Sequence, residues 1–318
     1  MPNTHRLQIQ EIEDALTVIE SVFLNSPQYH SPGLSERFDA DVIIKIETLN
    51  PIKSFKARGS EVLASRASRD TPIICASAGN FGQAMAYSCT KRQIPVTVYA
   101  SKYANQYKVD MMRAFGANVI QEGNDFDAAK EIARKKAHYS DARFVEDSAD
   151  IETLIGSGTI GLELSELPSQ LDYLLIPLGN GALFSGIARV MKDRSPATQL
   201  IAVQSVGAPA MIESMRKRQL IAHDHVNTIA DGIAVRLPVQ QSLIDLDGLV
   251  DDTLLVSEQE IISSIRLIHD QVGIIPEPSA VVGIAAIAEN RDRFKNKRIG
   301  TILCGGNLTE EQKKEWLV

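Results

Sequence analysis

The feature that most restricts the fold of this chain is a repeated alternation of short apolar runs and longer helical patterns. The expected strands are 42–47, 72–76, 96–100, 118–121, 143–145, 173–177, 199–204 and 299–303. The expected helices between and around them include 9–23, 83–91, 104–115, 125–139, 153–167, 208–219, 257–271 and 279–289. Strands separated by helices of this length form parallel sheets with crossover helices. The sequence therefore predicts an α/β fold of mostly parallel sheets flanked by helices, with loops at 25–33 and 223–248.

The first expected strand leads through a turn at Asn50-Pro51 into a helix that begins at Ser54 or Phe55. Lys56 would then lie in the first helical turn, where the positive end of the helix disfavours an ammonium group. A lysine whose pKa is lowered in this way is a candidate nucleophile that forms Schiff bases. The alternative is an ordinary solvated surface lysine.

Composition and charge exclude several classes of function. The net charge of −7 and the absence of a basic block argue against nucleic acid as a partner. The sequence has no apolar run that could span a bilayer and no signal-peptide pattern. An odd number of distant cysteines fits a reducing cytoplasm rather than a disulfide framework. The pair His223 and His225 is interpreted as a surface feature rather than a metal site.

Ligands in open α/β sheets bind beyond the carboxyl ends of the strands, so loops that follow strands are the informative ones. Gly179-Asn180-Gly181 lies between a buried strand and a helix. Backbone N–H groups and the helix N-terminus favour a phosphate there. These residues match neither common glycine-rich nucleotide motif, and a simple tight turn is the alternative.

Two further loops occupy similar positions. Ser77-Ala78-Gly79-Asn80 offers small residues and N–H groups for a carboxylate, and an amide that can donate to a phenolate-like oxygen. Its alternative is a helix cap, with Asn80 capping a helix that begins at Phe81. Cys304 is followed by two glycines that allow close approach, although a buried core thiol is the simpler interpretation. Together with Lys56, these loops are the parts needed to hold pyridoxal phosphate and an amino acid.

Six motifs in this order resemble the fold-type II pyridoxal-phosphate enzymes, and most closely their serine/threonine dehydratase (ammonia-lyase) family. They are Ser54-Phe-Lys-Ala-Arg-Gly59, Ser77-Ala-Gly-Asn80, Gly156-Ser-Gly-Thr-Ile-Gly-Leu-Glu163, Ala230-Asp-Gly-Ile-Ala-Val235, Glu277-Pro-Ser279 and Cys304-Gly-Gly-Asn307. The resemblance implies a two-domain fold similar to the tryptophan synthase β subunit. A small α/β domain at 71–145 would be inserted into a large cofactor-binding domain formed by 1–70 and 146–318.

The resemblance also implies roles for the candidate residues. Lys56 would hold pyridoxal 5′-phosphate as a Schiff base and act as the base on the substrate Cα, Asn80 would bond the ring oxygen, and Cys304 would face the pyridine nitrogen. The phosphate would be bound by Gly179, Asn180, Gly181, Ala182 and Leu183, and the substrate by Ser77, Ala78, Gly79 and Asn80. A neutral thiol at Cys304 leaves the ring a moderate electron sink, which favours β-elimination over transamination.

Several positions depart from the family pattern. Ile52-Lys53 stands where many dehydratases have Thr-Gly, and the sequence leaves open whether Lys53 points inward. Ala78 replaces the serine that serine racemases use as a second acid, and Phe81 replaces a common histidine. Gln204-Ser205 lacks the glutamate-led cation cluster of some relatives, so no metal is predicted. No regulatory domain is expected after residue 318, which argues against feedback control by an end product.

The sequence thus predicts a cytoplasmic lyase that converts L-threonine or L-serine to a 2-oxo acid and ammonia. Its partner is a small amino acid, neither nucleic acid nor membrane, and the resemblance implies a homodimer. The alternatives are a β-replacement enzyme of the cysteine synthase or diaminopropionate synthase type, or a serine racemase or hydroxyaspartate lyase. A catalytically silent or nucleotide-binding protein could use the same loops. The preferred hydroxy amino acid stays open, with Phe81 as the residue to watch.

Overall fold

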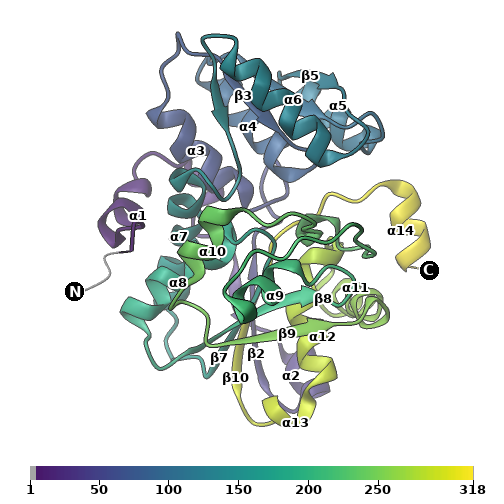
Figure 1. The fold of residues 1–318 in the computed structure, drawn as a ribbon. Coiled ribbons are helices and arrows are strands. Elements are labelled where there is room, and N and C mark those ends of the chain that lie inside the picture. Colours follow the sequence, from purple (N-terminus) through teal and green to yellow (C-terminus); the bar gives the residue numbers. More distant parts are fainter. Residues whose placement is uncertain (1–4, 318) are drawn as a thin grey trace.

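The computed structural model describes residues 5–317 and arranges their strands in two sheets (Figure 1). The larger sheet has the order β1-β2-β10-β7-β8-β9 and the smaller sheet β5-β4-β3-β6. The strands are β1 (Gln28–His30), β2 (Asp41–Ile46), β3 (Ile73–Ala76), β4 (Val96–Ala100), β5 (Asn118–Gln121), β6 (Arg143–Val145), β7 (Tyr173–Pro177), β8 (Gln199–Ser205), β9 (Asp252–Val256) and β10 (Arg298–Leu303). All strand pairs are parallel except β1 with β2. The predicted mostly parallel α/β fold is confirmed.

Helices surround the two sheets and cover both faces of the larger one. They are α1 (Ile9–Ala15), α2 (Pro32–Phe38), α3 (Lys56–Arg66), α4 (Asn80–Lys91), α5 (Gln106–Ala114), α6 (Phe126–His138), α7 (Ile151–Ser165), α8 (Ala182–Arg194), α9 (Ala210–Lys217), α10 (Gln240–Leu246), α11 (Glu258–Val272), α12 (Val282–Glu289), α13 (Arg291–Phe294) and α14 (Glu310–Leu317). Helices α7, α8 and α9 share one apolar core with the sheet, and α11 and α12 share the other. Neighbouring residues of β2 divide between these cores: Ile43 packs on the α7 side and Ile44 on the α11 side. This burial of both faces explains the continuous apolar runs in the strands.

The smaller sheet and its helices form the upper part of the molecule in Figure 1. Residues of α4 pack against one face of this sheet, and residues of α6, such as Ala133 and Ala137, pack against the other. Helix α3 reaches across, because its residues contribute to the apolar core under α4 and also pack against α7. The start of α3 is thereby fixed between the two sheets.

Several predicted elements differ in extent from the observed ones. The helix predicted at 9–23 ends at Ala15, and a short 3-10 turn, Ser21–Phe23, buries Phe23 farther along the chain. Helix α7 begins at Ile151 and runs without interruption through Gly156. A Cβ atom at Gly156 would lie 2.3 Å from the backbone of Arg58, so this glycine serves close packing of α7 on α3. The segments expected to be loops contain β1 and the whole of α10, and neither β9 nor α14 was expected.

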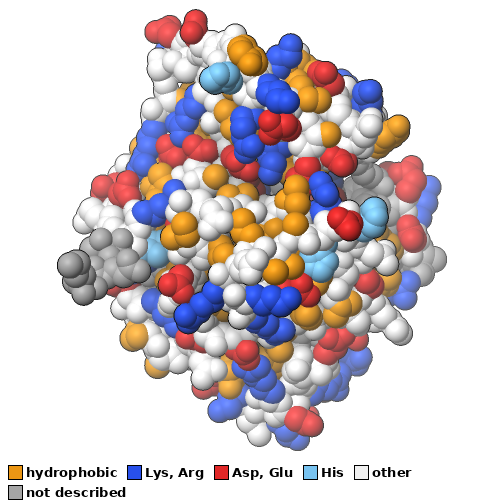
Figure 2. All heavy atoms as spheres, viewed as in Figure 1, with side chains coloured by type: hydrophobic (Ala, Val, Ile, Leu, Met, Phe, Trp, Pro, Cys, Tyr) orange, Lys and Arg blue, Asp and Glu red, His pale blue; other side chains and the backbone are white. Residues whose placement is uncertain are grey.

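Two observations concern membrane-spanning helices and the charge of the surface. Within residues 5–317, no helix is both long and apolar enough to cross a membrane. Figure 2 shows basic and acidic side chains interspersed over one face of the molecule, without a large area of a single sign.

Candidate active site

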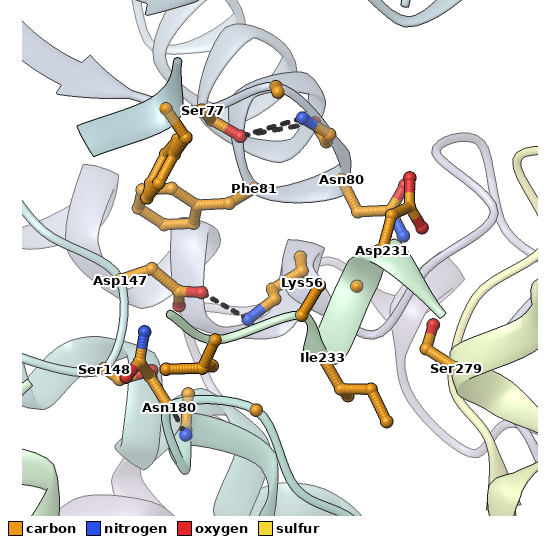
Figure 3. A pocket seen from close by; sticks show the side chains of 18 of the residues that line it. Lys56, Ser77, Asn80, Phe81, Asp147, Ser148, Asn180, Asp231, Ile233 and Ser279 are labelled. Atoms are coloured by element: carbon orange, nitrogen blue, oxygen red, sulfur yellow. Dashed lines mark hydrogen bonds and ion pairs between the residues drawn. The ribbon is translucent and has the colours of Figure 1, made fainter. Parts of the chain in front are cut away.

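A cavity of about 420 Å³ lies beyond the carboxyl ends of strands from both sheets (Figure 3). Its walls include the loops that follow β3, β6, β7 and β10, the starts of α3 and α6, and the segment before α10. The lining includes every residue proposed from sequence as a site residue: Lys56, Ser77, Ala78, Gly79, Asn80, Gly179, Asn180, Gly181, Ala182, Leu183 and Cys304. The strand-end rule therefore located one common cavity rather than several separate loops.

Lys56 lies in the first turn of α3, as predicted, although the helix begins at Lys56 itself rather than at Ser54 or Phe55. Its side chain is 17% exposed and its Nζ atom lies 2.5 Å from Oδ2 of Asp147, so the surface-lysine alternative is wrong. The Lys56 N–H donates to Oγ of Ser54 at 3.3 Å, and Ser54 forms a β-bridge with Gly305. These contacts hold the helix start against the loop after β10. Lys53, by contrast, is exposed and is not part of the cavity lining.

A buried cluster of charges anchors α3 beneath the cavity. Arg58, two residues after Lys56, has a fully buried side chain that donates to Glu47 at 2.8 and 3.0 Å and to Glu163 at 2.6 and 3.1 Å. Lys45 donates to the same Glu163 carboxylate. The four charges sum to zero, and each carboxylate is hydrogen-bonded, which is the condition for burying ions without a large loss of stability. The cluster joins β2, α3 and α7 and so fixes the direction in which Lys56 leaves the helix.

The loop after β7 presents backbone N–H groups at the start of α8. Gly181 has a φ angle of 99°, a left-handed conformation that glycine adopts without strain. A Cβ atom at Gly179 would lie 3.3 Å from the carbonyl oxygen of Gly232, so this position also favours glycine. Asn180 accepts a hydrogen bond from the backbone of Val239 at 3.1 Å, which fixes the loop from outside. The result is a narrow backbone cradle at a helix N-terminus, the arrangement that binds anions.

The loop after β3 is organised by Ser77. Its Oγ atom accepts hydrogen bonds from the N–H groups of Gly79 at 3.1 Å and Gly82 at 2.9 Å. Helix α4 begins at Asn80, and its N-cap residue is Gly79. The alternative in which Asn80 caps a helix beginning at Phe81 is therefore wrong, because Ser77 already satisfies the first N–H groups. The small side chains leave the loop backbone open to the cavity.

The Asn80 amide is held by residues from the other end of the chain. Its Nδ2 donates to Oε2 of Glu277 at 2.8 Å, and its Oδ1 accepts from Nδ2 of Asn307 at 2.9 Å. Glu277 also accepts a hydrogen bond from the N–H of Asn307 at 3.0 Å. Burial raises the pKa of Glu277 to about 6, although the nearby Lys108 ammonium opposes that change. Glu277 therefore fixes the orientation of an amide that faces the cavity.

Two ion pairs among the lining residues join the smaller sheet's helices to the segment before α10. Lys108 of α5 lies 2.7 Å from Asp231, and Arg236 lies 2.6 Å from Asp127 of α6. Burial alone would lower the pKa of Lys108, but the charges of Glu277 and Asp231 raise it. Both cations in this region are therefore neutralised by carboxylates.

Cys304 also lines the cavity, directly after β10. Burial raises the pKa of its thiol to about 12, and its Sγ atom lies 4.0 Å from the carbonyl oxygen of Ser279. The thiol is therefore neutral at physiological pH and faces the cavity as a small, weakly polar group.

Sequence reasoning assigned no role to seven charged residues of the lining: Lys108, Asp125, Asp127, Asp147, Asp231, Arg236 and Glu277. Asp147 follows β6 by two residues, so the strand-end rule that identified the other loops also applies to it. Glu277 belongs to a recognised motif but had no assigned role. The two candidate histidines lie outside the lining, and His223 pairs with Glu213 at 2.9 Å. In the described part of the chain, no group of histidine, cysteine and acidic side chains could hold a metal ion.

The family model described as pyridoxal-phosphate dependent enzyme matches residues 19–305. The L-threonine ammonia-lyase of Thermotoga maritima is 32% identical over 305 residues, which are 95% of this chain and 76% of that protein. A catabolic L-threonine dehydratase of Staphylococcus aureus is 30% identical and covers 97% of this chain and 91% of its own length. The processed form of threonine deaminase isoform 2 from Solanum lycopersicum is 29% identical, with a TM-score of 0.90 over 96% of this chain and 86% of that one.

Proposed function

This chain belongs to the pyridoxal-phosphate dependent enzymes, in their serine and threonine dehydratase group, and we propose that it converts L-threonine or L-serine to a 2-oxo acid and ammonia. It is a lyase. One observation carries the proposal: the Lys56 amine, the backbone cradle of residues 179–183 and the loop of residues 77–80 line one cavity of about 420 Å³.

Pyridoxal 5′-phosphate is the cofactor of the family, and the cavity residues fit it. The cradle at the start of α8 suits its phosphate, with a left-handed glycine and close backbone contacts that a Cβ atom would obstruct. Lys56 offers a primary amine to its aldehyde carbon, Asn80 faces the cavity with a fixed amide, and Cys304 offers a neutral thiol to its ring nitrogen. When bound, the cofactor supplies an electron sink that stabilises negative charge at the substrate Cα.

The residues of the chain would then position the substrate and move one proton. The open backbone of residues 77–80 receives the substrate carboxylate, with the Ser77 hydroxyl beside it. The Cα proton moves to Nζ of Lys56, and the electron pair of the Cα–H bond forms a Cα–Cβ double bond as the Cβ–O bond breaks. The departing hydroxide takes up a proton from solvent and leaves as water, and Lys56 returns to solvent the proton that it accepted. The unsaturated amine rearranges to an imine, and water hydrolyses it to the 2-oxo acid and ammonia.

The charges of the cavity support a substrate with a neutral side chain. Among the described lining residues, the cations are Lys56, Lys108 and Arg236, and each is paired with an aspartate. A substrate with a second carboxylate, such as β-hydroxyaspartate, would find no unpaired cation there. Since an unpaired buried charge is strongly unfavourable, threonine and serine are the better substrates.

The proposal is tested by replacing Lys56 and comparing this variant with one in which a nearby lysine outside the cavity is replaced. Lys56→Ala should abolish turnover of L-threonine and L-serine and remove the visible absorbance of bound cofactor. Lys53→Ala is the matched control, because Lys53 is exposed three residues away, and it should retain both. The same assay with β-hydroxyaspartate should give a much lower rate than with threonine. A Lys56→Ala protein that still bound cofactor as a borohydride-reducible adduct would contradict the assignment.

Three finer statements belong to the same proposal. We expect residues 71–145 to behave as a small domain inserted between 1–70 and 146–318, since the smaller sheet is formed within that segment. We expect a cytoplasmic location, in agreement with three free, buried cysteines. We expect a homodimer, which light scattering of the purified protein will test.

A further inference from the structure

Asp147 is the carboxylate that contacts Lys56. It lies in the loop after β6, and its Oδ2 atom is 2.5 Å from Nζ of Lys56 (Figure 3). The two residues are 91 positions apart, one at the start of helix α3 and the other after a strand of the smaller sheet, so the contact exists only in the folded protein. Both side chains line the cavity and both are largely shielded, with exposed fractions of 17% for Lys56 and 30% for Asp147.

The second oxygen of Asp147 is a further observation. Oδ1 is buried and has no hydrogen-bond partner among residues 5–317. Buried polar atoms without partners are uncommon and usually have a reason. A carboxylate with one oxygen on the lysine amine and the other unengaged can keep contact with that amine when it shifts within the cavity.

We propose that Asp147 is a positioning residue for Lys56, and that it stabilises the ammonium group that forms when Lys56 accepts the substrate Cα proton. This inference rests on the role proposed above for Lys56. The proton forms a new N–H bond at Nζ, the C–H bond breaks, and the positive charge that appears on Nζ lies against a negative charge already in place. Asp147 itself neither gains nor loses a proton.

The physical effect is electrostatic preorganisation. A fixed carboxylate in a partly shielded site stabilises charge that develops in the transition state more than charge in the ground state. Its removal should therefore lower kcat more than it changes KM. Removal of one preorganised partner of this kind lowers kcat by about 100-fold to 1000-fold.

Asp147→Asn tests this inference, because asparagine keeps the shape and removes the charge. In enzyme loaded with pyridoxal 5′-phosphate, kcat for L-threonine should fall by about 100-fold while KM changes little. Bound cofactor, measured by visible absorbance, should be retained. In the full chain before loading, Lys56 should react faster with formaldehyde and borohydride, because the ion pair no longer has to break before Nζ attacks. Mass spectrometry of the Lys56 peptide measures that rate independently of turnover.

A matched control and a chemical rescue complete the experiment. Glu146→Gln makes the same change one residue earlier, where the carboxylate pairs with Lys130 and Arg134 outside the cavity lining. It should leave kcat and Lys56 labelling unchanged. In Asp147→Ala, added formate should restore part of kcat, because it can occupy the vacated carboxylate position.

The outcomes separate this inference from the proposed function. Unchanged kcat and unchanged Lys56 labelling in Asp147→Asn would overturn the role of Asp147, and so would loss of cofactor binding, which would assign Asp147 to binding instead. An active Lys56→Ala enzyme would overturn the proposed function itself. Faster labelling with lower kcat and retained cofactor supports the inference.

Discussion

Replacing Arg58 by methionine removes the charge that holds the buried cluster beneath Lys56 together. The Arg58 side chain has no exposed surface, and it donates hydrogen bonds to Glu47, Glu163 and, at 3.0 Å, Thr159. Without it, the Lys45 ammonium alone faces two buried carboxylates. Methionine fills most of the same space, so the change isolates the charge rather than creating a large cavity.

The expected loss follows from the buried charge that remains. Removal of one partner of a buried ion pair lowers stability by about 3–5 kcal/mol. The free energy of unfolding of a typical domain is about 5–15 kcal/mol, so this loss is a large part of it. The control is Arg66→Met in the same helix, where the side chain is 39% exposed and its ion pair with Glu11 measures 3.4 Å. Such exposed pairs contribute about 0–1 kcal/mol.

The pH dependence of stability gives a second check on the effect of the buried cluster. Burial alone would raise the pKa of Glu163, but Arg58 and Lys45 together lower it. A carboxyl whose folded-state pKa is lowered contributes stability above its ordinary pKa of 4.5 and loses it as the pH falls further. In Arg58→Met, the carboxylates that have lost the guanidinium take up protons more readily. The difference in the free energy of unfolding between variant and parent should therefore shrink as the pH falls from 7 toward 4.5.

Thermal and urea unfolding followed by far-ultraviolet circular dichroism measure these effects. We expect Arg58→Met to lower the midpoint temperature by roughly 10 °C and Arg66→Met to leave it nearly unchanged. A loss below about 1 kcal/mol for Arg58→Met, or a loss that grows on acidification, would refute the reasoning about the cluster.

Three further predictions rest on single contacts or on burial. Burial raises the pKa of the thiols of Cys75, Cys89 and Cys304, to about 12 for the last two, so none of them should react with thiol reagents in the native protein. Fast labelling of the native protein, measured by mass spectrometry, would contradict this. Gly156→Ala should lower the midpoint temperature strongly, because the new Cβ would lie 2.3 Å from the Arg58 backbone, and an unchanged midpoint would argue against the close packing of α7 on α3. Burial raises the pKa of Glu277 to about 6, so ionisation of Glu277 above that pH should lower the stability of the parent by about 2 kcal/mol. Urea unfolding of Glu277→Gln and the parent at pH 7 and 4.5 should therefore shift in favour of the parent at the lower pH, and a constant difference would contradict the raised pKa.

The larger part of the fold could be predicted because its signals are local. Strands such as β7 and β10 are apolar on both faces, and the helices between strands show a periodicity of apolar residues within a short stretch of sequence. The edge strands β1 and β9 gave no such signal. β1 consists of Gln28-Tyr29-His30, and β9 is only partly buried, so neither has the continuous apolar character of a central strand.

The site could be predicted only as a set of loops. The loops after β3, β7 and β10 carry recognisable residue patterns, and the cavity contains the candidates drawn from them. Their charged partners come from distant positions: Asp147 is 91 residues from Lys56, Asp231 is 123 from Lys108, and Glu277 is 197 from Asn80. Such pairs depend on how the two sheets face each other. Helical or strand periodicity contains no information about that arrangement.

The position of β10 has a consequence for how this protein forms during synthesis. β10 pairs with β2 on one side and β7 on the other, so the last of the described strands completes the middle of the larger sheet. During synthesis, β2 leaves the ribosome more than 250 residues before β10, because the paired residues Asp41 and Arg298 are that far apart in the sequence. The smaller sheet needs only residues up to Val145 and can assemble first. Until β10 emerges, the Lys56 helix has no Gly305 bridge, and β2 presents an open edge that is a natural target for chaperones and for aggregation.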